Sequence, residues 1–212
     1  MNFRMSGKRK TYRSKSHKSR KLPLAIGILI IIGVVAVTLY MFSMNNPSGT
    51  GDSNTPAGKV LLQTSMGNIT IQLRDDKPTT TNNFKDLVKQ GVYDGTIFHR
   101  VIADFMIQGG MNTSASVATI QDEIGNDNHN IIGTVAMAKT SQPNSATSQF
   151  FINVVDNSKK VYQDGTTFDG TYTVFGTVTS GMDVVNNISQ VATDSNDKPL
   201  TDVMLIKAEI IS

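Results

Sequence analysis

The chain has 212 residues, no Cys and a formal charge of +3 that is unevenly distributed. Residues 1–21 carry nine Lys or Arg and no acid, which leaves 11 Lys or Arg against 17 Asp or Glu, a net charge of −6, in the rest. The absence of Cys excludes disulfides and thiolate metal sites, and the acidic remainder argues against nucleic-acid binding.

The first apolar segment, residues 22–42, contains no charged residue. A helix of this length spans roughly 30 Å, the thickness of a bilayer's hydrocarbon core. Lys and Arg lie only on its N-terminal side, since the next one is Lys59, so the positive-inside rule predicts a basic cytoplasmic tail at 1–21 and an extracellular C-terminal part. We therefore predict a single-pass cell-membrane protein with a signal-anchor helix at 22–42. A cleaved signal peptide is the alternative, although no Ala-x-Ala-like site follows.

Residues 43–58 are small, polar and rich in Gly, Pro and Ser. Such a segment cannot bury enough apolar area to order itself, so it predicts a flexible linker. Residues 59–212 then form one folded domain, which we expect to be monomeric.

Alternating apolar residues at 60–64 and 69–73 predict two antiparallel strands joined by a turn at 65–68. Helix-start residues after Pro78 and a stop at Gly91 predict a first helix, and apolar spacing predicts a second one at 181–188. Six further strands are expected, two within 98–110 on either side of a bend at Ala103-Asp104, and the others at 131–138, 149–155, 172–178 and 203–211. This pattern predicts a mainly β domain, a closed eight-stranded antiparallel barrel with two capping helices, preceded by one transmembrane helix.

Residues 98–110 place one cation, Arg100, and one amide, Gln108, beside the bulky apolar Phe105 and Met106. This is the chemistry of an apolar pocket with a polar wall, although an arginine in such a place is also compatible with a structural ion pair. The three histidines, at 17, 99 and 129, have no metal-ligand spacing, so we predict no metal site.

Several motifs occur together in one order. They are Phe98-His99-Arg100-Val101-Ile102, Phe105-Met106-Ile107-Gln108-Gly109-Gly110, Ser148-Gln149-Phe150-Phe151-Ile152, Val174-Phe175-Gly176 and Gly181-Met182-Asp183-Val184-Val185. In these motifs the chain resembles the cyclophilin peptidyl-prolyl cis-trans isomerases, particularly bacterial members, from about Lys59 to the C-terminus. The resemblance implies an eight-stranded antiparallel barrel with a helix over each end, isomerase activity on proline-containing polypeptides, and no cofactor.

By the same resemblance Arg100 is the catalytic residue, and the substrate-binding positions fall into three groups. Gln108 holds the arginine or the peptide backbone, and His99 lines the site without proton transfer or is structural. The proline socket comprises Phe105, Met106, Phe151, Phe168 and Tyr172. The stretch that binds the peptide before proline comprises Ala138, Lys139 and Thr140, with Gln149 beside it.

The chain departs from the family before Phe175. Counting back, Tyr172 stands at the usual His, Phe168 at the usual Leu and Thr167 at the usual Trp, whereas a gap of one residue puts Phe168 at the Trp position. Both registers lack the Trp, so we expect weak binding of the cyclic-peptide inhibitor that favours it.

Two functions from different classes are compatible with these residues. The first is a membrane-anchored peptidyl-prolyl isomerase that assists the folding of exported or surface proteins outside the cytoplasmic membrane. The alternative is a non-catalytic proline-peptide-binding chaperone or scaffold on the same fold. The Arg100 cation favours the enzyme, because a pure binder has no need for it.

Overall fold

The computed structural model describes residues 57–125 and 127–212. The predicted basic tail, the predicted membrane anchor and the linker up to residue 56 lie outside the described residues. No helix within the described part is long and apolar enough to cross a membrane.

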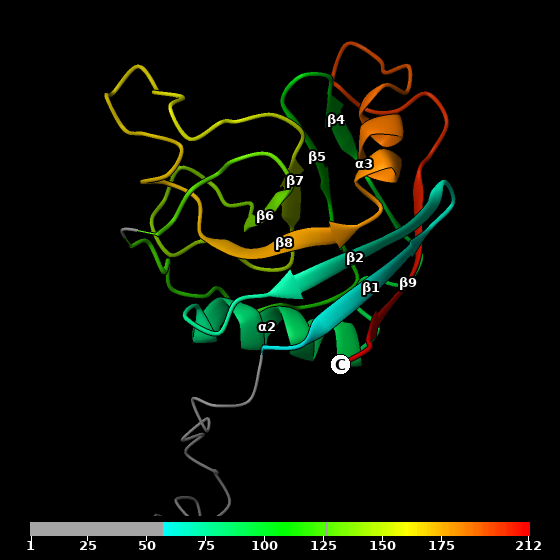
Figure 1. The fold of residues 1–212 in the computed structure, drawn as a ribbon, viewed down its shortest axis with the longest axis horizontal. Coiled ribbons are helices and arrows are strands. Elements are labelled where there is room, and N and C mark those ends of the chain that lie inside the picture. Colours follow the sequence, from blue (N-terminus) through cyan, green and yellow to red (C-terminus); the bar gives the residue numbers. More distant parts are fainter. Residues whose placement is uncertain (1–56, 126) are drawn as a thin grey trace, which may run out of the picture. The chain divides into compact units, whose positions relative to one another are not determined.

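One curled antiparallel sheet dominates the described residues (Figure 1). Its strands are β1 (Lys59–Thr64), β2 (Gly67–Leu73), β3 (Thr96–Ile97), β4 (Arg100–Ile102), β5 (Met106–Gly109), β6 (Thr134–Met137), β7 (Phe150–Asn153), β8 (Val174–Ser180) and β9 (Met204–Ile210). They lie in the order β3-β9-β1-β2-β8-β6-β7-β5-β4. The mainly β prediction is thus confirmed.

The predicted number and closure of the strands are wrong. The sheet has nine strands, because the two-residue β3 pairs with the start of β9 and is too short to leave a pattern in the sequence. Its edge strands, β3 and β4, have no backbone pairing with each other among the described residues. The sheet is therefore curled rather than closed by a continuous ladder.

The predicted bend inside residues 98–110 is confirmed. β4 and β5 pair antiparallel, with Arg100 opposite Gln108, and Asp104 between them adopts a left-handed backbone conformation with φ of 55°. Gly110 follows β5 with φ of 77°, and a Cβ there would lie 2.8 Å from the Ser148 carbonyl oxygen. Glycine is required where the chain leaves β5.

Two helices, α2 (Pro78–Lys89) and α3 (Met182–Ser189), lie at opposite ends of the curled sheet, as predicted (Figure 1). The backbone N–H groups of Thr79 and Thr80, in the first turn of α2, donate to the Glu123 carboxylate at 3.0 and 2.8 Å. This distant carboxylate satisfies two N–H groups that no local side chain caps. The Phe84 ring of α2 is part of the main apolar core. Its centroid lies within 5.6 Å of the ring centroids of Tyr93, Phe150 and Phe175.

β6 and β7 are buried on both faces. Phe150 and Ile152 of β7 belong to the main core inside the curl, whereas Phe151 between them belongs to a second apolar cluster on the other face of the sheet. Met106 of β5 and Ala136 of β6 join this second cluster, while their neighbours Ile107 and Val135 join the main core. Alternation along neighbouring strands therefore builds a separate apolar surface, on which the candidate site lies.

Candidate functional site

A cavity of about 440 Å³ lies over the second apolar cluster. Nine of the predicted site residues line it, namely Arg100, Phe105, Met106, Gln108, Ala138, Lys139, Phe151, Phe168 and Tyr172. They come from β4, β5 and β7, from the turn between β4 and β5, and from the segments that follow β6 and precede β8. Sheet pairing thus brings together residues that are up to 72 positions apart in the sequence.

Aromatic rings form the apolar part of this cavity. Phe168, which is 3% exposed, lies 5.5 Å from Phe105, 5.7 Å from Phe151 and 4.7 Å from Tyr172 between ring centroids. Most of these rings meet edge to face, the arrangement that their quadrupoles favour. The Lys160 ammonium lies 4.3 Å from the centroid of the Phe105 ring, so a cation covers one side of the rim.

Arg100 supplies the cation of the polar wall. Its side chain is 44% exposed, and its Nε donates to Asp197 at 3.3 Å. Gln108 is its cross-strand partner on β5 and donates through Nε2 to Gln149 Oε1 at 2.9 Å. The register of β4 against β5 therefore places a guanidinium and an amide side by side above the aromatic rings.

Three predicted residues do not line this cavity. His99 lies half-buried beside Arg100, and its Nδ1 has no hydrogen-bond partner among the described residues. Gln149 contacts Gln108 instead, and its Oε1 accepts the hydrogen bond from the Gln108 amide. Thr140 donates to Ser145 Oγ at 2.8 Å and lines a neighbouring groove instead.

Tyr162 lines the cavity and was not predicted. Its ring stacks on Phe168 with centroids 6.1 Å apart, and its hydroxyl donates to the Tyr172 hydroxyl at 3.0 Å. It stands in an exposed loop closed by a bridge between Val161 and Thr167. A lone aromatic residue among polar neighbours is only a weak signal in the sequence, so reasoning from the motifs alone missed it.

The neighbouring groove has a volume of about 700 Å³. It shares Lys139, Tyr162 and Tyr172 with the first cavity, so the two are contiguous. Lys139 is nearly buried and its ammonium lies 3.0 Å from the Asp122 carboxylate, which also accepts the backbone N–H of Asn144. The ion pair therefore fixes the wall between the two cavities rather than offering a free charge.

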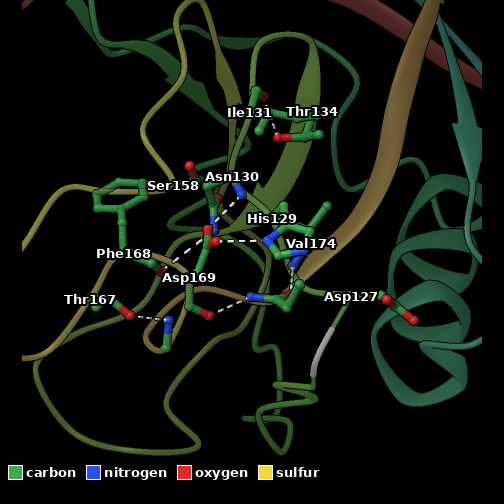
Figure 2. A network of polar contacts seen from close by, with 12 residues as sticks. Asp127, His129, Asn130, Ile131, Thr134, Ser158, Thr167, Phe168, Asp169 and Val174 are labelled. Carbon is green, nitrogen blue, oxygen red and sulfur yellow. Dashed lines mark hydrogen bonds and ion pairs between the residues drawn. The ribbon is translucent and has the colours of Figure 1, made fainter.

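A network of buried polar side chains holds the segment that carries Phe168 and Tyr172. Asn128, which is 1% exposed, donates to the carbonyl oxygens of Asp169 and Tyr172 at 2.6 and 2.8 Å, and accepts the backbone N–H of Val174 at 2.7 Å. Figure 2 shows the Asp169 side chain facing His129 and the backbone N–H of Asn130.

The same network reaches the opposite wall of the cavity. Asn153 donates to Thr134 and Asn130, and Asn157 donates both to Asn153 and to the carbonyl oxygen of Phe105 at 2.9 Å. Buried amides thus connect Phe105 on one side to the segment of Phe168 on the other. Because each of these groups would be costly to leave unpaired, the network fixes the width of the cavity.

Burial, and secondarily the positive charge of Arg100, lowers the pKa of His99 below its usual value of 6.5. The folded protein therefore takes up this proton less readily than the unfolded chain does. Protonation of His99 therefore favours the unfolded chain. The stability that the protein gains from holding this residue neutral is fully present above pH 6.5 and is lost as the pH falls below it. We expect the free energy of unfolding, measured in urea at pH 5 and pH 7, to fall more in the wild type than in His99→Gln. Equal falls in the two proteins would contradict this expectation.

Comparisons with known proteins agree with one another. Residues 59–210 match the family model described as cyclophilin type peptidyl-prolyl cis-trans isomerase/CLD. Peptidyl-prolyl cis-trans isomerases of Streptomyces antibioticus and Acinetobacter baylyi are 47% and 45% identical to the chain. Both alignments cover 72% of this chain, and they cover 98% and 85% of the two relatives.

A solved structure with a similar fold is a cyclophilin type peptidyl-prolyl cis-trans isomerase of Cryptosporidium parvum, determined in the presence of the dipeptide Ala-Pro. It has a TM-score of 0.63 and 28% sequence identity, and the match covers 73% of this chain and 99% of that one. Similarity in sequence and similarity in fold thus point to the same family.

Proposed function

The chain belongs to the cyclophilin family and is a peptidyl-prolyl cis-trans isomerase, and on that premise we propose that it acts on proline-containing polypeptides bound in the aromatic cavity, with Arg100 as the catalytic residue. The Cryptosporidium parvum relative, solved in the presence of Ala-Pro, supports a proline-containing ligand. The observation that carries the proposal is that Arg100 lines the same cavity as Phe105, Met106 and Phe151.

The chemistry follows from the nature of the X-Pro bond. Rotation about a peptide bond has a barrier of about 18–20 kcal/mol, because the nitrogen lone pair is delocalised into the carbonyl. A guanidinium that donates a hydrogen bond to the prolyl nitrogen favours the twisted state, in which that lone pair is localised. It therefore stabilises the transition state more than either planar isomer. This mechanism uses no nucleophile.

The remaining lining residues bind the substrate. The ring of proline fits between Phe105, Met106, Phe151 and Phe168, and the backbone near Ala138 and the amide of Gln108 meet the peptide groups beside it. Because the second groove adjoins this cavity across Lys139 and Tyr172, we place the residues that flank proline there.

A protease-coupled assay with a proline-containing peptide tests this proposal. Residues 59–212 in catalytic amounts are expected to accelerate conversion of the cis to the trans isomer, which otherwise takes tens of seconds or longer. A protein that only binds proline segments would give a measurable affinity for the peptide and no increase in this rate.

Tyr162 gives a prediction about substrate binding. Tyr162→Ala removes the ring stacked on Phe168 and part of the wall shared by the two cavities, so we expect KM to rise about threefold to tenfold with little change in kcat. Tyr162→Phe keeps the ring and loses only the hydroxyl bond to Tyr172, and is expected to stay within about twofold of the wild type. Equal values of KM for Tyr162→Ala and the wild type would show that Tyr162 does not contribute to substrate binding.

The place of action is a further part of the proposal. We propose that residues 22–42 anchor the protein in the cell membrane, with residues 1–21 in the cytoplasm and the isomerase domain outside, where it assists the folding of exported or surface proteins. The uncharged segment and the basic residues on its N-terminal side support this orientation.

Protease treatment of intact cells, together with mass measurement of the membrane fraction, tests the anchor. An uncleaved chain whose C-terminal domain is digested from outside fits the proposal. A shorter released domain, or one protected from the protease, contradicts it.

A further inference from the structure

The side chain of Arg100 has a single hydrogen-bond partner among the described residues, and that partner comes from a distant part of the chain. Its Nε donates to Asp197 Oδ2 at 3.3 Å, across 97 positions of sequence. None of the described residues accepts a hydrogen bond from the two terminal nitrogens of the guanidinium. One edge of the guanidinium is therefore held, while its other N–H groups are available toward the cavity that Arg100 lines.

Asp197 stands at the tip of a narrow, well-braced hairpin. Thr193 and Pro199 form a bridge at its base, and the backbone N–H of Asp194 donates to the Lys198 carbonyl oxygen at 2.8 Å. The Asp194 carboxylate in turn accepts the backbone N–H groups of Asn196 and Lys198 at 2.8 and 3.0 Å. These contacts hold the hairpin in one conformation. The Asp197 side chain takes part in none of them.

The backbone of Asp197 is also attached to the strand that carries Arg100. Its carbonyl oxygen accepts the N–H of Val101 at 2.8 Å, one residue beyond Arg100 in β4. Asp197 itself has φ of 62°, in the left-handed region that non-glycine residues seldom occupy. The hairpin thus bends so that both the carbonyl oxygen and the carboxylate of one residue face β4.

An anchored guanidinium differs from a free one in the number of orientations that it samples. Arg100 has a long side chain that is 44% exposed, so packing alone does not fix it. Catalysis by a hydrogen bond to the prolyl nitrogen requires the donor to be in place before rotation begins, since reorientation during the reaction adds to the barrier. A contact at Nε fixes the plane of the guanidinium without using the terminal N–H groups.

We propose that Asp197 is a positioning residue, which orients the Arg100 guanidinium toward the substrate from the hairpin at residues 192–200. This inference rests on the proposed catalytic role of Arg100. The Asp197 carboxylate, which lies outside the recognised motifs, thereby contributes to the rate of isomerisation. Its loss is expected to lower kcat rather than to weaken substrate binding.

The test compares three variants of the full chain. Asp197→Gly removes the carboxylate, and glycine accepts the left-handed backbone without strain. Asp197→Asn keeps an oxygen that can accept from Arg100 Nε and removes only the charge. Asp202→Asn is the matched control, because Asp202 lies just beyond the hairpin and pairs with Lys198 at 3.4 Å. The substitution removes the same charge from a residue that makes no hydrogen bond or ion pair with Arg100.

We expect Asp197→Gly to lower kcat by about fivefold to tenfold, with KM within about twofold of the wild type. Both Asn variants should keep kcat within about twofold of the wild type. In the background of Arg100→Ala, Asp197→Gly should cause no further loss, because the group that it orients is absent. An unfolding midpoint close to that of the wild type is the criterion that each variant is folded.

Three results would overturn the inference. They are a kcat of Asp197→Gly within twofold of the wild type, an equal loss in Asp197→Asn, or an equal loss in Asp202→Asn. Failure of the proposed function gives a different result, namely an Arg100→Ala variant as active as the wild type. An inactive Arg100→Ala protein with a fully active Asp197→Gly protein would leave the proposed function intact and reject only the role of Asp197.

Discussion

Replacing Arg100 by Ala is expected to lower kcat/KM for a proline-containing peptide by about 100-fold to 1,000-fold. Among the described residues that line the cavity, Arg100 and Lys139 are the cations, and the Lys139 ammonium is paired with Asp122. The Lys160 ammonium lies at the rim, over the ring of Phe105. Removal of the guanidinium leaves the aromatic cavity intact, so the peptide should still bind with an affinity within a few-fold of the wild type. The loss should therefore fall mainly on kcat, as expected for an interaction made in the transition state.

Arg100→Lys is the control for charge alone. A lysine keeps the positive charge but lacks the planar, directional donors of the guanidinium, so we expect intermediate activity. The stability of both variants should change by no more than about 1 kcal/mol, because the pair with Asp197 is exposed on both sides. A value of kcat/KM for Arg100→Ala within a few-fold of the wild type would exclude Arg100 as the catalytic residue.

Asn128→Ala is expected to have the largest effect on stability. The substitution removes three hydrogen bonds of a buried side chain, and it leaves the Val174 N–H and the carbonyl oxygens of Asp169 and Tyr172 without this partner. At roughly 1 kcal/mol for each bond, the free energy of unfolding should fall by about 3 kcal/mol. KM should rise as well, because the same bonds hold the segment that carries Phe168.

Urea denaturation with an unchanged m-value measures this loss. Asn187→Ala is the matched control, since Asn187 is exposed on α3 and its side chain makes no hydrogen bond within the described residues. It should change stability by less than about 0.5 kcal/mol. Equal stability of the two variants would show that the buried network contributes little to the fold.

The sequence predicted those parts of the fold that repeat a local rule. Alternation identified β1 and β2, and helix-start and stop residues identified α2. In a surface helix or a half-buried strand, the spacing of the apolar residues within the element itself shows which face is buried. β6 was predicted too long, at 131–138 instead of Thr134–Met137. Exposed Ile131 and Ile132 extend its apolar run into a turn, where the Thr134 N–H bonds to the Ile131 carbonyl oxygen.

The polar parts of the site could not be predicted in the same way. Asn128, Asn130 and Asn157 lie between strands and Asn153 ends β7, and all four are buried, yet asparagine at such positions normally indicates an exposed turn. Their burial depends on which loops meet in space, and no local pattern contains that information. The same reason explains Tyr162 and Asp197, which reach the cavity and Arg100 from loops outside the recognised motifs.

The most direct test of the central account is the rate of cis/trans exchange of a proline peptide while it is bound. Exchange NMR at saturating protein measures this rate apart from binding, for the wild type and for Arg100→Ala. We predict that the bound peptide exchanges far faster on the wild type than in free solution, and that on Arg100→Ala it binds but exchanges at nearly the free rate. Wild-type exchange on the Arg100→Ala protein would contradict the account.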